Sequence, residues 1–440
     1  MSLGQQIFQA GVVGAGGAGF PTHKKLVPGI ELLIVNAAEC EPLLASDRYL
    51  MRHQAGDIVA GIQAIRQAYG IPRVVIGTKA HYVRELAALR AAIAAAGADI
   101  EIHELPSFYP AGDEQTLVYE ITGQTVPPGG VPIALGMAVS NVTTVYQIFQ
   151  AGQGVPVTHR YVTVTGAVAH PVVVDAPDGT LVADLVAAAG GATVEPYFFV
   201  RGGPLMGRQY PGDAASTTSF GKADGGLVVL PADHPLVVFN HKPIEHLLNE
   251  TRSACIQCQL CTELCPRYLI GHQMRPHRVM RAFQTGTTPV DILDALLCCE
   301  CGICELFSCP MGLSPRKINI YAKRLLREKG ITRGDQTIYP EHTRERAARR
   351  IAQSRFVERW QLGGYPADLE DEVALAPARV VIPLKHGVGQ PATPCVAAGE
   401  KVAAGQVIAT VDETAVGALV HASIDGRVTA VTEQAITIER

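Results

Sequence analysis

The sequence is poor in aromatic residues and in charge. Phe, Trp and Tyr make up 6% of its 440 residues, with a single Trp, and charged residues make up 18%. The formal net charge is −4, so the chain lacks the basic excess that is typical of nucleic-acid-binding proteins. The hydrophobic fraction of 48% and a length beyond one compact core indicate a globular chain of roughly two to four domains.

Long uninterrupted apolar runs are also missing. Residues 121–158 carry no charged side chain, but prolines and glycines between positions 127 and 132 interrupt the stretch. A membrane-spanning helix needs about 20 mostly apolar residues in sequence. The N-terminus has no positively charged start followed by an apolar segment, so it does not predict a secretory signal. We therefore expect no membrane span and a reducing, cytoplasmic setting.

Cysteine, by contrast, is concentrated in one region. Of 11 cysteines, nine fall between Cys255 and Cys309. The first run reads C-x₂-C-x₂-C-x₃-C-P and the second C-x₂-C-x₂-C-x₄-C-P. Three closely spaced thiolates can face three irons of one [4Fe–4S] cubane, while the fourth iron needs a more distant sulfur. In two-cluster ferredoxins the fourth Cys of each run therefore ligates the other cluster.

This pattern predicts two [4Fe–4S] clusters. We assign one to Cys255, Cys258, Cys261 and Cys309, and the other to Cys298, Cys301, Cys304 and Cys265. Zinc sites usually pair two C-x₂-C motifs across a long gap, and disulfide scaffolds spread their cysteines over small secreted chains, so both are disfavoured. Cys299 is left over: it is a spare thiol, or it replaces Cys298 as ligand, although only Cys298 keeps the x₂ step.

Hydrophobic periodicity divides the chain into segments. Residues 1–155 alternate short apolar runs with Ala-rich helical patterns, which predicts an α/β domain. Its expected strands are Leu32–Val35, Arg73–Gly77 and Asp99–Glu104, and its expected helices are Asp57–Ala68 and Tyr82–Ala96.

The remaining segments are smaller. Residues 160–235 predict an α+β module that opens with a strand at Tyr161–Val168, and 245–330 hold the cysteines. Residues 331–374 are rich in Arg and Glu and are expected to form a helical linker whose charges face solvent. Residues 375–440 carry short Val/Ile-rich strands separated by turns, typical of a small β-barrel or sandwich; Cys395 is expected to be buried there.

Polar and glycine-rich turns punctuate the first segment. The loop Gly14–Gly19 precedes Lys24 and Lys25, and closely spaced glycines let backbone N–H groups approach an anion. It lacks the strand and the distant acidic residue of a dinucleotide-binding Rossmann motif. Three further turns follow, at Asn36–Pro42, Tyr109–Glu114 and Ser140–Thr144. Each alone could be an ordinary loop.

Taken in order, these stretches resemble a known family. GAGGAGFPTHKKL, VNAAECEP, YPAGDE and SNVTT are similar to the C subunit of the Rnf complex and, more distantly, to the flavoprotein subunit of respiratory complex I. The run CCECGICELFSCPMGLSP and the C-terminal position of IPLKHGVGQPATPCVAAGEKVAAGQVI resemble the cobalamin reductases of propanediol-utilisation microcompartments, a branch of the Rnf C-like family. The resemblance implies four parts: a complex I flavoprotein-like FMN domain, a β-grasp (SLBB) domain, a two-cluster ferredoxin-like domain and a barrel-sandwich hybrid.

The resemblance also implies roles for residues in these motifs. It implies that the Gly14–Gly19 loop and Lys25 hold the phosphate side of FMN, with Asn141 and Thr144 completing the phosphate contacts. Asn36, Glu39 and Cys40 would line the isoalloxazine. Asp113 and Glu114 would lie near the flavin and the nicotinamide, and Phe20 and Glu41 would touch NADH. Glu39, Asp113 and Glu114 are the candidate catalytic residues. The candidate cofactor-binding set is Gly14, Gly16, Gly17, Gly19, Phe20, Lys25, Asn36, Glu39, Cys40, Glu41, Tyr109, Gly112, Asp113, Glu114, Asn141 and Thr144. The flavoprotein of complex I differs in having Arg at the position of Ala15 and Asp at that of Ala38.

The implied function is an NADH-dependent flavoprotein reductase. NADH gives up two electrons as hydride, iron–sulfur clusters take one at a time, and FMN can hold either number. The expected acceptor is cobalamin, reduced from cob(II)alamin to cob(I)alamin in a bacterial microcompartment, with a corrinoid-adenosylating enzyme and shell or cargo proteins as partners. No Asp-x-His-x-x-Gly corrinoid motif occurs, so the corrin is expected to bind transiently or on a partner. The alternatives are an NADH–ferredoxin or flavodoxin oxidoreductase and a relay subunit without its own nicotinamide site.

Overall fold

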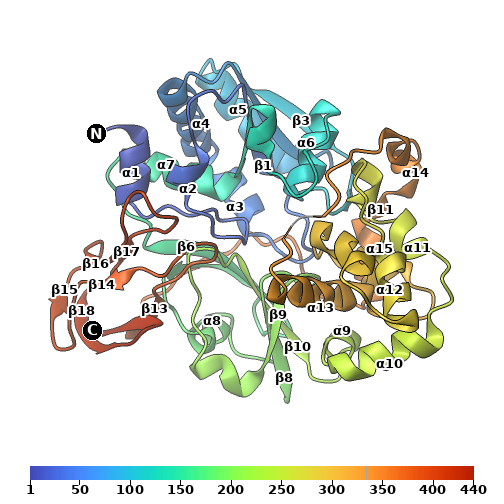
Figure 1. The fold of residues 1–440 in the computed structure, drawn as a ribbon. Helices are drawn as coiled ribbons and strands as arrows, with labels where there is room; N and C mark the ends of the chain where they lie inside the picture. Colours follow the sequence, from blue (N-terminus) through green and yellow to red (C-terminus); the bar gives the residue numbers. More distant parts are fainter. Residues whose placement is uncertain (333) are drawn as a thin grey trace.

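The computed structural model describes residues 1–332 and 334–440. The chain forms four regions around a common centre (Figure 1). The N-terminal α/β region lies at the top, the second region lies below it, the cysteine-bearing helices lie to the right, and the C-terminal β module packs on the left beside the first helix. No helix in these two ranges is both long and apolar enough to cross a bilayer.

A four-stranded parallel sheet, in the order β3-β2-β1-β5, forms the centre of the first region. Val and Ile dominate its central strands, and their side chains alternate between two buried faces. Leu33 and Val35 belong to the core under α4 and α7, whereas Leu32 and Ile34 belong to the core under α6. The elements are β1 (Leu32–Ala37), β2 (Arg73–Lys79), β3 (Glu101–Leu105), β5 (Met137–Asn141), α4 (Ala55–Tyr69), α5 (Val83–Ala95), α6 (Glu114–Thr122) and α7 (Val142–Gly152).

The strand order fixes where this sheet can bind a ligand. β2 and β3 lie on one side of β1 and β5 lies on the other, so the order reverses between β1 and β5. In open α/β sheets ligands bind at the carboxyl ends of the strands at such a switch point. Four shorter elements complete the region: α1 (Leu3–Gln9), α2 (Thr22–Lys25), α3 (Ser46–His53) and β4 (Phe108–Tyr109).

The second region is a six-stranded mixed sheet in the order β12-β7-β6-β10-β8-β9. One of its edge strands, β12 (Glu372–Ala374), pairs parallel to β7 and comes from far along the chain. The sequence did not indicate this strand, because three exposed residues carry no periodic signal. The other elements are β6 (His159–Gly166), β7 (Val172–Pro177), α8 (Val182–Ala188), β8 (Tyr197–Arg201), β9 (Arg208–Pro211) and β10 (Gly226–Pro231).

Short helices carry the cysteine loops. An apolar core that includes Leu247, Met280 and Ile318 packs these helices together. The helices are α9 (Pro235–Asn240), α10 (Ile244–Ala254), α11 (Leu260–Glu263), α12 (Pro276–Thr285) and α13 (Pro315–Glu328). Most of the cysteines lie in the loops between these helices, whereas Cys261 lies in α11 and Cys304 begins a short π-helical turn, Cys304–Ser308.

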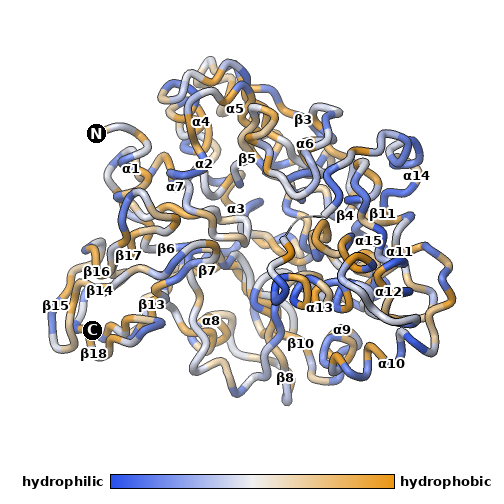
Figure 2. The backbone as a smooth tube through the Cα atoms, viewed as in Figure 1, coloured by the Kyte–Doolittle hydropathy of each residue, from blue (hydrophilic) through white to orange (hydrophobic). Residues whose placement is uncertain are grey.

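The charged segment that follows differs from the expectation. Its backbone is strongly hydrophilic around α14 (Figure 2), but Arg346 is only 4% exposed. Arg346 and Arg350 both donate to the buried carboxylate of Glu120 on α6. The predicted solvated face therefore holds for Arg344 and Glu345, which are exposed, but not for Arg346 and Arg350, because these two cations pair with a buried acid. The expected helix is also broken into α14 (Arg346–Arg349), β11 (Ile351–Ala352) and α15 (Gln353–Arg359); position 333 of the predicted linker lies outside the described residues.

The C-terminal module consists of two small antiparallel sheets, ordered β13-β19-β18-β15 and β14-β16-β17. Aliphatic side chains including Ile382, Ile408 and Ile438 fill the space between them, so the predicted β module is confirmed. Cys395 is exposed rather than buried. The strands are β13 (Arg379–Pro383), β14 (Thr393–Pro394), β15 (Lys401–Val402), β16 (Val407–Thr410), β17 (Val420–His421), β18 (Gly426–Val431) and β19 (Ala435–Glu439).

Candidate functional site

Asn36 and Asn141 mark the switch point of the parallel sheet. They face each other in register at the carboxyl ends of β1 and β5. The Asn36 amide donates to the carbonyl of Gly112 at 2.8 Å, which ties the Tyr109–Glu114 turn to β1. The Asn141 side chain caps α7 by accepting from the N–H groups of Thr143 and Thr144. The three polar turns predicted from the sequence therefore meet at one end of the sheet.

The Gly14–Gly19 loop lies over the N-terminus of α7. The Ala15 N–H donates to Thr144 Oγ1 at 2.8 Å, and a Cβ on Gly16 would lie 3.5 Å from the Asn141 Cβ. Gly17 has a φ of +102° and no heavy atom within 4 Å of where its Cβ would stand. The loop thus presents exposed backbone beside a helix N-terminus, and both features favour an anion.

Gly19 has a different environment from the other loop glycines. A Cβ there would lie 1.7 Å from the His386 carbonyl of the C-terminal module, and Val388 N–H donates to the Ala18 carbonyl at 3.0 Å. Close packing against the β module therefore requires glycine at this position. Phe20 follows half-buried, and its carbonyl accepts from the Gly14 N–H at 2.8 Å.

Lys25, Asp113 and Glu114 form ion pairs around the same turn. Lys25 Nζ lies 2.6 Å from Glu114 Oε1, with about a third of each side chain exposed. Asp113 caps α6 by accepting from the Thr116 N–H at 3.0 Å. Its second oxygen pairs at 2.8 Å with Arg267, which belongs to the cysteine region. The predicted cofactor residues thus also connect two regions of the chain.

The Glu39–Glu41 turn contains two carboxyl groups with unusual pKa values. Burial, reinforced by the nearby Asp47 carboxylate, raises the pKa of Glu39 to about 8. Burial raises the pKa of Glu41 to about 7, against the opposing effects of the Leu205 N–H and Arg316. Glu41 Oε2 accepts from Leu205 N–H at 2.8 Å, while its Oε1 is buried without a hydrogen-bond partner among the described residues. Such groups can hold a proton near neutral pH.

Cys40 lies between these two acids and touches the neighbouring turn. A Cβ on Gly112 would stand 3.2 Å from Cys40 Sγ and 2.4 Å from the Ala38 carbonyl, so only glycine fits there. Burial raises the pKa of the Cys40 thiol to about 12. Cys40 is therefore a neutral, packed thiol and not a candidate nucleophile.

Tyr109 connects this site to the second cysteine run. Its side chain is 1% exposed, and its hydroxyl donates to the Cys301 carbonyl at 2.7 Å. Tyr109 and Cys301 belong to the same apolar core, with Cys40 packed against it. The turn predicted to line a flavin is thus in direct contact with a loop predicted to bind a cluster.

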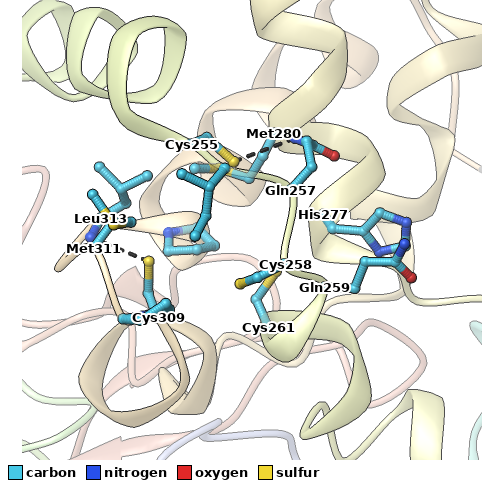
Figure 3. Close-up of a pocket in the computed structure, with 13 residues that line it drawn as sticks. Cys255, Gln257, Cys258, Gln259, Cys261, His277, Met280, Cys309, Met311 and Leu313 are labelled. Atoms are coloured by element: carbon cyan, nitrogen blue, oxygen red, sulfur yellow. Dashed lines mark hydrogen bonds between the residues drawn. The ribbon is translucent and has the colours of Figure 1, made fainter.

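Cys255, Cys258, Cys261 and Cys309 line one cavity. Figure 3 shows the side chains of these four residues around a common space, although Cys309 comes from the second run. The Gln257 amide donates to Cys255 Sγ at 3.2 Å and the Leu313 N–H to Cys309 Sγ at 3.4 Å. These are the same four cysteines that the spacing in the sequence assigned to one cluster. That they ligate a cluster stays a prediction.

The other four cysteines form a second, more buried group. Cys265 packs in one cluster with Leu297 and Cys298, and burial raises the pKa of its thiol. Burial likewise raises the pKa of Cys304, with Cys298, Cys261 and Cys265 among its neighbours. Cys265 of the first run therefore lies with the second run, as Cys309 lies with the first. This exchange is the geometry that two neighbouring cubanes need.

Cys299 lies inside this second group. A hydrogen bond with Cys301 and the charge of Arg267 lower its pKa to about 7, against the effect of burial. Cys298 Sγ instead accepts from the Glu300 N–H at 3.4 Å. Both thiols are thus close to the group, and the choice between them stays open.

The arrangement of the cysteines fits cubanes. All eleven cysteines, each within the described ranges, are free thiols. Thiolates spread around a space, with an extra N–H donor at Cys255 and Cys309, fit the wider [4Fe–4S] group.

Sequence reasoning missed three polar residues of this site. Asp47 accepts from Asn141 and Thr143 beneath the glycine loop, and Arg267 pairs with Asp113. Arg160, from the second region, donates to the Ala15 carbonyl at 2.8 Å. Local motifs could not reveal Arg160 or Arg267, since each reaches the site from another region of the chain.

Family models match four separate parts of the chain. The Nuo51 FMN-binding domain matches residues 7–150 and the SLBB domain matches residues 161–209. The 4Fe-4S dicluster domain matches residues 254–314, and the RnfC barrel sandwich hybrid domain matches residues 367–440. The predicted fold classes are confirmed, and the chain combines an FMN-binding domain with a 4Fe-4S dicluster domain.

Solved structures support the same fold. The NAD⁺-reducing [NiFe]-hydrogenase in its H₂-reduced state aligns with a TM-score of 0.51 and 21% identity, over 76% of this chain and 63% of the hydrogenase chain. The air-oxidised state of that enzyme gives a TM-score of 0.50 and 22% identity, over 80% and 66%. At this identity the likeness concerns the fold alone.

Two curated relatives match over essentially the whole chain. Cobalamin reductase PduS of Citrobacter freundii is 41% identical over 100% of this chain and 96% of its own length. PduS of Salmonella typhimurium is 41% identical over 99% and 96%. The C subunit of the ion-translocating oxidoreductase complex of Erwinia tasmaniensis is 35% identical over 61% of this chain and 32% of its own. This chain belongs to the PduS cobalamin reductase family.

Proposed function

We propose that this protein is an NADH-dependent reductase that passes electrons through FMN and two [4Fe–4S] clusters to cobalamin, reducing cob(II)alamin to cob(I)alamin. The observation that carries the proposal is the contact between the flavin-site turn and the second cysteine run, where Tyr109 donates to the Cys301 carbonyl at 2.7 Å. Electron transfer requires the donor and acceptor groups to be neighbours. Full-length similarity to the cobalamin reductases supports the acceptor.

The residues at the switch point suit a non-covalent FMN. The exposed backbone of Gly16 and Gly17 in the Gly14–Gly19 loop, the N-terminus of α7 and Lys25 would hold the phosphate. Asn36, Glu39 and Cys40 would line the ring system. When bound, FMN accepts an electron pair from NADH and passes electrons on singly. The proposed role of Phe20 and Glu41 is to contact NADH.

Glu39 is the proposed proton-handling residue. Its carboxyl group holds a proton at neutral pH, because its pKa is raised to about 8. Its Oε1 accepts from the Glu41 N–H at 2.9 Å, which fixes its orientation. A group whose pKa lies near the working pH can both give and take a proton. Asp113 and Glu114 would position the turn around the cofactor through their pairs with Arg267 and Lys25.

The cysteines are arranged in an inner and an outer group. The inner group of Cys265, Cys298, Cys301 and Cys304 lies against the flavin-site turn, which suits the first acceptor. The outer group includes Cys258, which is exposed. Exposed Ile256 and Met311 flank the outer cavity. The outer group is therefore the proposed exit to the acceptor.

We further propose that the protein works inside a bacterial microcompartment, beside a corrinoid-adenosylating enzyme and shell or cargo proteins. The family relationship supports this location. Cob(I)alamin is a strong reductant that is lost on contact with oxidants, so transfer to a neighbouring enzyme would protect it. The absence of a corrinoid motif in the sequence supports transient binding at the exit.

An anaerobic assay with the cofactor-loaded protein tests the acceptor. NADH and cob(II)alamin are mixed with a catalytic amount of this protein, with and without a corrinoid-adenosylating enzyme. The loss of the cob(II)alamin absorbance is then followed. The proposal predicts NADH-dependent reduction. Reduction of ferredoxin or flavodoxin while free and enzyme-bound corrin stay oxidised would favour an NADH–ferredoxin type oxidoreductase. No reaction of NADH with any acceptor would favour a relay subunit.

A further inference from the structure

Arg160 is a buried cation at the border between the second region and the glycine loop. It lies on β6 and is 7% exposed. Its Nε donates to the Asp224 carbonyl and its Nη2 to the Ala15 carbonyl, both at 2.8 Å. Its Nη1 is buried and has no hydrogen-bond partner among the residues described. Buried guanidinium N–H groups are normally hydrogen-bonded, so one without a partner indicates a place for a ligand that accepts a hydrogen bond.

The neighbouring acids do not satisfy this donor. Among the acids that raise the pKa of Arg160 against the effect of burial, Asp47 acts most strongly, followed by Asp224 and Glu39. However, Asp47 Oδ1 accepts from Thr143 Oγ1 at 2.6 Å and Oδ2 from the Asn141 amide at 2.7 Å. Asp47 thus contributes negative charge near Arg160 without accepting a hydrogen bond from its Nη1.

Ala15 places Arg160 beside the anion-binding features of the loop. Thr144 at the start of α7 holds the Ala15 N–H, and Arg160 holds the carbonyl of the same residue. The next residues, Gly16 and Gly17, are exposed and present open backbone. A helix N-terminus, free loop amides and a guanidinium therefore converge on one short stretch of chain.

We propose that Arg160, supplied by β6 of the second region, is a binding residue for the phosphate of FMN. The inference rests on the proposed function. A guanidinium matches phosphate oxygens geometrically and electrostatically better than any other side chain. The flavin site is then shared between the FMN-binding domain and the second region, whose strand β6 carries Arg160 immediately before the SLBB match.

Comparing FMN with riboflavin, which lacks the phosphate, tests this role. Flavin is removed from the full-length protein, and Kd for each flavin is measured by fluorescence quenching in the unmodified chain, in Arg160→Gln and in Arg201→Gln. Arg201 is a matched control: it is a cation of the same domain and pairs with Asp224 at 2.6 Å. We expect Arg160→Gln to weaken FMN binding by about tenfold or more, with riboflavin changed much less, because a charge-assisted hydrogen bond is lost. The control should keep both affinities.

Several outcomes would overturn the role. Equal losses for both flavins in Arg160→Gln, or an unchanged preference for FMN, would mean that Arg160 only joins the two domains. If the Gln variant does not fold, Arg160→Lys keeps the charge and should still lose part of the FMN preference; an unaltered preference there also contradicts the role. If the unmodified protein binds no flavin at all, the proposed function itself fails, which is a distinct result.

Discussion

Single residues set the proton chemistry of the site. Glu39 and Glu41 follow β1 directly, and burial raises both pKa values, to about 8 and about 7. The same burial gives Cys40 a pKa of about 12 and keeps it neutral. The motif therefore combines two acids that titrate near neutrality with an inert thiol between them.

The raised pKa of Glu39 predicts a pH-dependent stability for the flavin-free protein. A carboxyl group whose folded pKa exceeds its ordinary value of 4.5 binds protons preferentially in the folded state. Its contribution is fully present below about pH 4.5 and is lost as the pH rises towards about 8. We expect Glu39→Gln to reduce the fall in urea-unfolding midpoint between about pH 5 and pH 8, and Glu31→Gln, at an exposed position, to leave it unchanged. Identical pH profiles for all three proteins would contradict the assignment.

The identity of the ligand between Cys298 and Cys299 is also a residue-scale prediction. The x₂ step favours Cys298, so Cys298→Ser should lower iron from about eight to about four atoms per chain. Cys299→Ser should keep about eight, as should Cys395→Ser at its exposed position. Iron and acid-labile sulfide are measured after anaerobic reconstitution. Loss of a cluster in Cys299→Ser alone would reverse the assignment.

Elements far apart in the sequence form ion pairs and pack against one another. Glu120 on α6 is 6% exposed in its side chain and pairs with Arg346 and with Arg350. Arg346 and Arg350 also lie over the Phe108 ring of β4, within 6 Å of its centroid. The segment that looked like a solvated linker is therefore packed onto the flavin-binding domain.

Removing the shared acid should release this segment. Glu120→Gln leaves two cations without their partner, and breaking a buried pair typically costs about 3–5 kcal/mol. We expect a lower urea-unfolding midpoint and faster tryptic cleavage around residues 344–350. Glu341→Gln, at an exposed position nearby, is the control. Equal cleavage rates in both variants would show that the pairing does not hold the segment.

Element prediction succeeded where periodicity is strong. The parallel strands β1 and β2 and helices α4 and α5 follow from apolar runs and regular spacing. β12 and β11 could not be predicted, because short strands gain their stability from a distant partner rather than from their own pattern. The pairing of Arg346 and Arg350 was missed for the same reason, because composition does not show that Glu120 lies opposite them in the fold.

At the scale of the whole molecule, the chain surrounds one site with several regions. The glycine loop touches the second region through Arg160 and the C-terminal module through Val388. The Tyr109–Glu114 turn touches the cysteine region through Cys301 and Arg267. Cysteine spacing and the flavin motifs predicted the two kinds of site, but not these contacts between them. The predicted domain limits, the cofactor residues and the cluster ligands stay predictions.

Anaerobic addition of NADH to the cofactor-loaded protein tests the central claim most directly, with flavin absorbance and the electron paramagnetic resonance of the clusters recorded on the same sample. The account predicts that the flavin bands bleach and that signals of reduced [4Fe–4S] clusters appear with them, since the flavin turn and the inner cysteines are in contact. Bleached flavin with clusters that stay oxidised, or a sample that holds zinc in place of iron, would contradict it.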